Sequence, residues 1–465
     1  ISYFSAQGVS KAKTSQAIKD LESWTIIIYR QNHNALFVFQ GSDIDIHNMV
    51  LERIESVSHG VDWTKVCDIS QNILATAHYH RTGTMRWANT KLINKIEPGF
   101  INSLKKEPLK GASFLSFLLP ASAEVAKELA DAMPNLPFAA IGYASSLERL
   151  KEAAIELIAL NQIAKEEDKI EHDLIATKEL DSRVLLASQQ VEKELSSVFQ
   201  QSTWQHQGEE IIGRSLSQVA SVIAGNVFNA APKVINELVN RSKPSGSATA
   251  AIKKLLIRMV DYPDERDLGF DAETFPPEKG LYLSCLVKKE LHKFDPESEQ
   301  ADFYMPNENN ADMALLFNCA FNYLQDNQNS VVYVSEIYSL WGKEPFGVAK
   351  GILPIWCLAF LMANTEHLAF YDKDVNNNDI FISQPDEEFA IKLIKEPQNV
   401  GIKFVAMDGI KLNHLASLAS AINSGSVKPS TLKLAQEYVQ FVSELTPWTK
   451  KTNNLSKLAR GVRDL

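Results

Sequence analysis

The chain has 465 residues, of which 45% are hydrophobic and 22% charged, and its formal net charge is −10. This length exceeds a single hydrophobic core and predicts several domains, and the composition excludes a disordered or fibrous protein. The acidic balance argues against a protein that coats nucleic acid over its whole surface, although a local basic patch would still bind phosphates.

The N-terminal residues predict a helix, a strand hairpin and a second helix. Helical spacing of apolar residues runs from Lys11 to Trp24, and the apolar strands TIIIY and ALFVF follow. This order is typical of the second half of a winged helix, so we interpret residues 1–58 as such a module. Its first helices would precede residue 1, and we expect the chain to be a piece of a larger protein. A further helix is expected from about Ile44 to Val57.

Residues 59–144 predict a small α/β domain. A helix leads into a strand near Thr84 to Ile93, and the apolar runs FLSFLLP and PFAAIGY bracket the helix SAEVAKELADAM. This β-α-β pattern indicates a parallel strand pair beside the first strand. Residues 145–207 follow, and apolar 3-4 spacing without Gly or Pro as far as Phe199 predicts a long helical hairpin or coiled coil. We expect the hairpin to turn near Glu166 to Asp173.

The C-terminal half predicts three more regions. Residues 208–329 are expected to form a helical domain with a basic patch. Residues 330–400 repeat the first pattern, with a strand, a short helix, a long apolar helix and a hairpin, and indicate a second winged-helix-like module. Residues 401–465 are expected to form C-terminal helices. The predicted fold class is therefore mainly α with small β elements.

The letters GSDIDI from Gly41 to Ile46 resemble the metal-binding segment of nucleotidyltransferases. In those enzymes the paired aspartates lie on a strand about ten residues after the Gly-Ser. Here Asp43 and Asp45 follow Ser42 directly, and an enzyme would need a third carboxylate nearby. Ser42 and Asp45 instead have the spacing of a capping box, in which both side chains accept backbone N–H groups. We predict a helix cap and no catalytic residue.

His78 and His80 lie two residues apart, so on a strand they would face one side. Two ligands are too few for a metal site, and we interpret this stretch as a surface strand. On that strand Arg81 and Arg86, beside Trp87, would touch phosphate or stack on a base.

The segment from Asp372 to Ser383 resembles a calcium-binding loop. It has Asn377 where the loop requires Gly and Ser383 where it requires a bidentate Glu. We therefore predict a polar hairpin tip and no metal site.

Positive charge concentrates between Lys233 and Arg258. The sequence SKPSGSATAAIKK within it starts a helix whose free N–H groups and lysines would hold a phosphate, although a solvated helix face is the alternative. The candidate nucleic-acid-binding residues are Lys233, Arg241, Lys243, Lys253, Lys254 and Arg258, with Arg81 and Arg86 as a second surface.

The sequence carries no phosphate-binding loop. The letters GKEP at 342–345 have no Gly five residues upstream and no Ser or Thr after the Lys. We predict no cofactor in this segment. The longest apolar stretch, from Gly351 to Ala363, is shorter than the roughly 20 residues that span a bilayer. Four widely separated cysteines indicate neither disulfides nor a zinc ribbon, and we expect a cytoplasmic protein.

Several segments carry a family resemblance, among them FVFQGSDIDI, ATAHYHRTGTMRW, NRSKPSGSATAAIKKLL, FPPEKGLYLSCLVKKELHKF, EPFGVAKGILPIWCLAFLMA, IKEPQNVGIKFV and LTPWTKKTNNLSKLARGVRDL. Together they resemble the region downstream of the P-loop domain in large bacterial antiviral-defence ATPases of the BREX type.

The resemblance implies an upstream domain that binds ATP and Mg²⁺, followed by a winged helix, an α/β insert with a coiled coil and a second winged helix. It implies a regulatory or interaction segment that works with other subunits of a defence complex, with possible nucleic-acid contact and oligomerisation through the parent ATPase. No Walker residue lies in this chain. The alternative is a stand-alone nucleic-acid-binding winged-helix protein.

Overall fold

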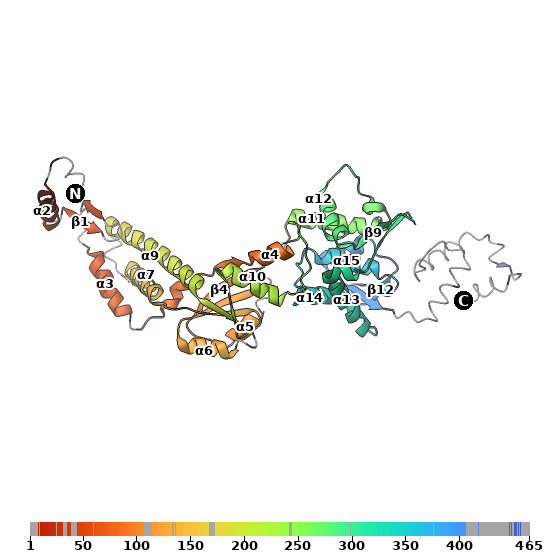
Figure 1. The fold of residues 1–465 in the computed structure, drawn as a ribbon, viewed down its shortest axis with the longest axis horizontal. Coiled ribbons are helices and arrows are strands. Elements are labelled where there is room, and N and C mark those ends of the chain that lie inside the picture. The colour runs from red at the N-terminus through yellow and green to blue at the C-terminus, as the bar shows by residue number, and fades with distance from the viewer. Residues whose placement is uncertain are drawn as a thin grey trace. The chain divides into compact units, whose positions relative to one another are not determined.

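In a computed structural model of the protein (Figure 1), residues 10–405 are described apart from 25, 31–34, 39–43, 59, 107–113, 133, 135, 167–172, 241–243, 298 and 375, and only isolated positions are described outside that range. The chain is mainly helical with small sheets, which confirms that part of the predicted fold class. It divides into two compact units, Ile1–Leu74 with Trp87–Ile223, and Ala75–Arg86 with Ala224–Leu465.

The four N-terminal elements form as predicted: α2 (Lys11–Ser23), β1 (Ile27–Arg30), β2 (Ala35–Val38) and α3 (Ile46–Val57). β1 and β2 pair antiparallel, with Ile27 opposite Val38. Thr14 is the buried residue of α2, and the hairpin exposes Val38 at 68%. The elements are therefore confirmed, whereas their interpretation as a winged helix remains a prediction.

A six-stranded sheet forms the centre of the first unit, in the order β3-β4-β5-β6-β7-β8. Its strands are β3 (Asn72–Leu74), β4 (Trp87–Ile93), β5 (Leu115–Pro120), β6 (Ala139–Tyr143), β7 (Thr203–His206) and β8 (Glu209–Ile211). β4, β5 and β6 are parallel, as predicted. Helices α5 (Phe100–Lys106) and α6 (Ala123–Ala132) connect them. All residues of β5 are buried, because an apolar run between two parallel neighbours has no solvent side.

A helical hairpin is inserted between β6 and β7. Its helices, α7 (Glu148–Glu166) and α9 (Leu174–Gln201), pack against each other, and α3 packs on α7. Asp173 caps α9 by accepting the backbone N–H groups of Ile175 and Ala176 at 2.9 and 3.1 Å. The ends of the two helices, Glu166 and Leu174, agree with the predicted hairpin. β7 begins inside the region predicted as helical, because buried Trp204 joins it to the sheet.

The second unit contains most of the remaining elements. The boundary between the units falls within α10 (Leu216–Val227), and the later elements are α11 (Gly246–Asp261), α12 (Pro277–Cys285), β9 (His292–Asp295), β10 (Gln300–Phe303), α13 (Ala311–Asp326), α14 (Val334–Gly342), α15 (Leu353–Ala363) and α16 (Glu387–Lys395). Short 3-10 helices cover Trp63–Cys67 in the first unit and Arg266–Gly269, Val287–Lys289 and Glu308–Asn310 in the second. None of the helices in the described ranges is long and apolar enough to cross a membrane.

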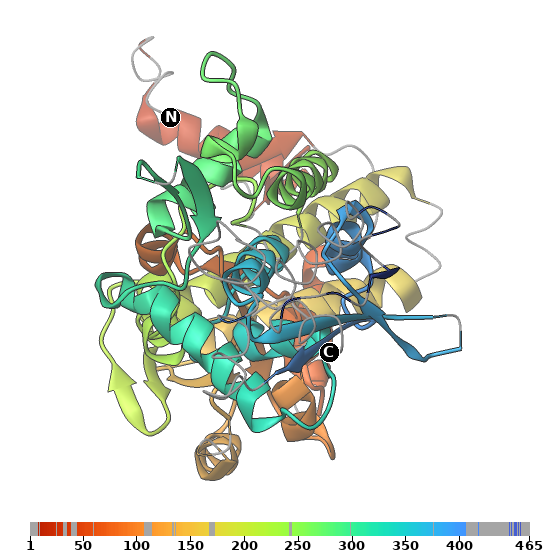
Figure 2. The ribbon, with the colours of Figure 1, turned by 90° about the vertical axis from the view of Figure 1, so that its right-hand side faces the viewer.

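A four-stranded antiparallel sheet covers one side of this core, in the order β11-β14-β12-β13. The strands are β11 (Val332–Tyr333), β14 (Val400–Phe404), β12 (Leu368–Lys373) and β13 (Asp379–Ile382), and the β12–β13 hairpin is drawn in blue in Figure 2. The predicted domain boundary at residue 400 cuts β14, so this module continues to Phe404. The helices expected after residue 405 lie outside the described residues.

The segment Ala75–Arg86, with helix α4 (Thr76–Thr82), belongs to the second unit although it connects two strands of the first. Val234 N–H donates to the Thr82 carbonyl at 2.8 Å, and Met85 N–H donates to the Asn240 carbonyl at 2.9 Å. The predicted domain 59–144 is therefore interrupted. The surface strand expected for His78 and His80 is wrong, because both residues lie on α4.

Candidate functional sites

The GSDIDI segment includes the cap of helix α3, and the cap residue is Asp45. Its carboxylate accepts the backbone N–H of Asn48 at 3.1 Å and the Asn48 side-chain amide at 2.7 Å. The sequence predicted a capping box in which Ser42 is the N-cap and Asp45 is the third residue of the helix. Asp45 is itself the N-cap, so the helix starts at Ile46. Ser42 and Asp43 lie outside the described residues.

His78 and Arg86 form a buried polar cluster. Arg86 Nε donates to His78 Nε2 at 2.9 Å, and Arg86 Nη2 donates to the Gly347 carbonyl at 2.7 Å. The guanidinium lies 3.6 Å from the centroid of the Phe228 ring. Only 9% of Arg86 is exposed. The prediction that Arg86 contacts phosphate at a surface is therefore wrong, because its N–H groups bond to His78 and Gly347 inside the fold.

Electrostatics keep His78 neutral. Burial and the positive charges of Arg86 and Arg81 lower the pKa of its imidazole to about 3. Arg86 Nε makes the shorter contact, 2.9 Å to Nε2, and Arg81 Nη2 lies 3.3 Å from Nδ1, so guanidinium groups face both ring nitrogens. Burial also lowers the pKa of Arg86, but a guanidinium stays protonated at neutral pH. The Nε2 lone pair of this neutral imidazole is used by Arg86, so the ring acts as a structural hydrogen-bond acceptor.

The basic residues between Lys233 and Arg258 differ in their exposure and in their partners. Arg258 Nη1 donates to the carbonyls of Leu268 and Gly269 at 3.0 Å, and its guanidinium lies 4.4 Å from the Phe270 ring centroid. Lys254 Nζ lies 3.6 Å from a Glu278 oxygen. Lys233 and Lys253 are exposed, and Arg81 is exposed on α4. Arg241 and Lys243 lie outside the described residues, so a basic patch over the whole stretch stays a prediction.

The segment that resembles a calcium loop is the tip of the β12–β13 hairpin, as predicted. Within this tip the Asp374 carboxylate accepts the backbone N–H groups of Asn376 and Asn378 at 2.7 and 2.8 Å. Asn377 has a left-handed φ of 62°, which Asn tolerates better than most residues. Within the described residues, no three His, Cys, Asp or Glu side chains gather as metal ligands.

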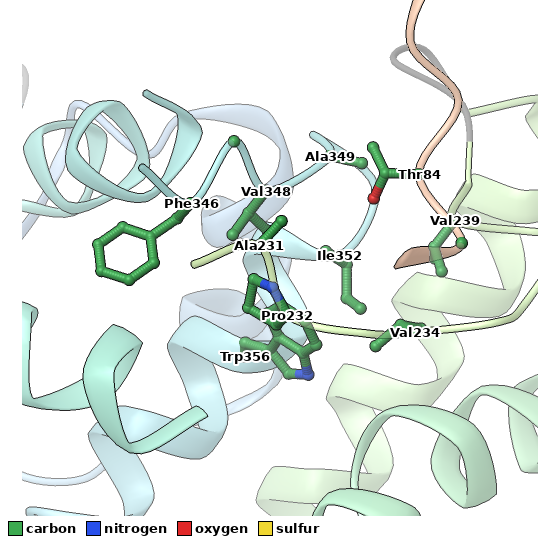
Figure 3. Close-up of a pocket in the computed structure, with 12 residues that line it drawn as sticks. Thr84, Ala231, Pro232, Val234, Val239, Phe346, Val348, Ala349, Ile352 and Trp356 are labelled. Atoms are coloured by element: carbon green, nitrogen blue, oxygen red, sulfur yellow. The ribbon is translucent and has the colours of Figure 1, made fainter. Parts of the chain in front are cut away.

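The pocket in Figure 3 lies inside the second unit, between the turn at Gly83 and helix α15. Pro232, Val348 and Trp356 are among its apolar walls. Its volume of about 10 Å³ is the space of roughly one water molecule. This pocket therefore fits a buried water and no metabolite.

A group of side chains that the sequence reasoning missed lies on the outward face of the four-stranded sheet. Residues alternate along each strand, and Val332, Phe370 and Ile402 are buried in the core. Their neighbours point the other way. We call this surface the outer sheet face, and its members are Tyr333, Ala369, Tyr371, Lys373, Asp379, Phe381, Gly401 and Lys403.

The rings of the outer sheet face contact each other and the lysine between them. Tyr371 and Phe381 meet edge to face, with centroids 5.9 Å apart. Lys373 Nζ lies 3.9 Å from the centroid of the Tyr333 ring. Tyr333 OH donates to Asp379 at 3.1 Å. The alternation of Leu368 and Phe370 with Tyr371 and Lys373 is the sequence signal that could have located this face.

No protein-family model matches this sequence, and no curated protein or solved structure shows significant similarity to it.

Proposed function

We propose that this chain is a regulatory and interaction segment of a large P-loop ATPase in bacterial antiviral defence, without an ATP site of its own. The resemblance of the quoted segments suggests the class of parent protein. The observation that carries the regulatory role is the direct connection of the helical hairpin to the six-stranded sheet.

The hairpin is joined to two neighbouring strands by short connections. β6 ends at Tyr143 and α7 begins at Glu148, while α9 ends at Gln201 and β7 begins at Thr203. β6 and β7 are hydrogen-bonded neighbours. A shift of the helices would therefore reach the sheet without a flexible linker between them. In the proposed function, the parent domain moves the hairpin when its nucleotide changes.

The chain leaves this sheet after β3, contributes one segment to the second unit and returns in β4. β3 and β4 pair with Leu74 opposite Trp87, and their connection is the segment Ala75–Arg86. That segment is hydrogen-bonded to Val234 and Asn240 and held by Arg86 at Gly347. A packed segment with fixed partners is the kind of element that passes a displacement onward.

The alternative is a stand-alone nucleic-acid-binding winged-helix protein, and one observation disfavours DNA binding by its second module, residues 330–400. In helix-turn-helix proteins the recognition helix enters the major groove. Here the helix before the β12–β13 hairpin is α15, and all nine residues from Leu353 to Leu361 are buried. Such a helix is part of the core and has no free face for DNA.

The test combines the gene with its activity. We expect the coding sequence upstream of Ile1 to contain a Walker motif. In cells that carry the whole gene, Leu195→Glu would unpack α9, where Leu195 is 1% exposed, and abolish protection against phage while ATP hydrolysis continues. Exposed Lys193 supplies the matched control, Lys193→Glu, which should protect normally. An upstream sequence without a Walker motif, or protection that survives Leu195→Glu, would refute the proposal.

A further inference from the structure

The outer sheet face places aromatic rings and ammonium groups on one flat surface. Phe381 is 58% exposed, and the edge contact with Tyr371 holds its ring in place. An exposed ring that is already fixed loses little conformational entropy when another flat group stacks on it. Proteins use such rings as platforms for nucleic-acid bases.

We propose that the outer sheet face binds single-stranded nucleic acid, with bases stacked on Phe381 and Tyr371 and phosphates held by Lys373 and Lys403. This goes beyond the proposed function and does not depend on it. Four-stranded sheets that present aromatic side chains bind unpaired bases in this way. Bases in a duplex are stacked on one another and show only their edges in the grooves, so the flat face favours a single strand.

Tyr333 has a different part from the other two rings. Lys373 lies over its ring, and its hydroxyl is bonded to Asp379. A Cβ at Gly401 would lie 3.7 Å from Tyr333 Cε1 and 3.2 Å from the Tyr371 Cβ. The nearest atom to such a Cβ is Val331 Cγ1, at 2.6 Å, so Gly401 chiefly makes room for Val331. Tyr333 therefore positions the ammonium of Lys373 and leaves base stacking to Phe381 and Tyr371.

The charges of the face have the sign that phosphate requires. The face has two lysines, Lys373 and Lys403, and one carboxylate, that of Asp379. This carboxylate accepts a hydrogen bond from Tyr333. Lys403 is paired across the sheet with the small residue Ala369. The face thus carries a net positive charge on a chain whose total charge is −10. Phosphate contacts release counterions, so binding should weaken as salt rises.

The experiment measures fluorescence anisotropy of a labelled oligothymidylate of about 15 nucleotides, and of a duplex of the same length, with the whole chain at low salt. We expect the single strand to bind more tightly than the duplex. Loss of one stacked base costs about fivefold to 100-fold in affinity, and we expect that loss for Phe381→Ala and for Tyr371→Ala. Lys373→Gln and Lys403→Gln should each flatten the log-log salt slope by about 0.7.

Two matched controls keep the test specific. Phe275 is 73% exposed and also has a lysine over its ring, Lys279 Nζ at 4.2 Å, but it lies in the loop before α12. Lys193 is exposed on α9 and lies outside both candidate surfaces. Phe275→Ala and Lys193→Gln should leave the affinity unchanged, and circular dichroism should show every variant folded. The inference is overturned if no single strand binds at low salt, if Phe381→Ala binds normally, or if Phe275→Ala weakens binding equally. Self-association that Phe381→Ala abolishes, with no oligonucleotide bound, would also overturn it in favour of a protein partner.

Discussion

At the scale of single residues, Gly83 shows how closely the segment Ala75–Arg86 is packed. Its φ is +80°, and a Cβ there would lie 1.7 Å from the Val234 carbonyl oxygen. We predict that Gly83→Ala lowers the free energy of unfolding by about 3 kcal/mol, from backbone strain and the displaced contact. Gly280 lies within α12 with open space around its Cα. Gly280→Ala should stabilise the protein by up to about 1 kcal/mol in the same urea titration. Equal stability of the two variants would contradict the prediction.

His78 predicts a pH dependence of stability. Its pKa is about 3 in the fold, against about 6.5 for an unperturbed histidine in the unfolded chain. The unfolded chain therefore binds a proton that the fold excludes, so the stabilisation is complete above pH 6.5 and is lost as the pH falls toward 3. The slope from this group is at most about 1.4 kcal/mol per pH unit. His78→Gln removes the titrating group, so the difference in unfolding free energy between wild type and variant should shrink between pH 7 and pH 4. A difference that stays constant over this range would show that His78 titrates normally.

At the scale of elements, the N-cap of α3 separates a structural role for GSDIDI from a catalytic one. Asp45→Ala removes the acceptor for the Asn48 N–H and should cost about 1 kcal/mol. Asp45→Asn keeps an acceptor and should cost much less. Thermal unfolding with and without Mn²⁺ measures both effects. A stabilisation by Mn²⁺ that disappears in Asp45→Asn would instead support a metal site.

The long elements were predictable from the sequence, whereas the short ones were not. Apolar periodicity located α3, α7 and α9 and the strands β4, β5 and β6, because each buries a face or a whole strand in a core. β7 and β9 have four residues each, too few for a periodic signal. A surface strand was predicted for His78 and His80, which lie on α4, and the ring that packs on His78 comes from Phe228, far along the chain.

The same distance in sequence limited the prediction of sites. The burial of Arg86 depends on the Gly347 carbonyl, 261 residues away, so its charge alone suggested a surface. The outer sheet face depends on β14 lying between β11 and β12. This strand order brings the Tyr333 ring close to Lys373, and no local sequence pattern predicts the strand order. Asp45, by contrast, was found because a cap acts within one helical turn.

At the scale of the whole molecule, we predict that the 465 residues neither bind nor hydrolyse ATP. A phosphate loop needs backbone N–H groups around the phosphates, a lysine and a magnesium-binding hydroxyl at fixed spacing, and the sequence lacks that motif. Isothermal titration with Mg-ATP should show no binding at micromolar concentration. Saturable heat at that concentration would refute the prediction and with it the proposal that nucleotide is handled by another domain of the parent chain.

The segment Ala75–Arg86 also sets the order of events during synthesis. It emerges from the ribosome about 150 residues before Val234, whose backbone N–H donates to the Thr82 carbonyl. At about 5–20 residues per second, Val234 follows roughly 8–30 seconds later. The sheet of the first unit can pair β3 with β4 in that interval and hold the segment as a closed loop. The second unit would then assemble around a piece that its neighbour has already shaped.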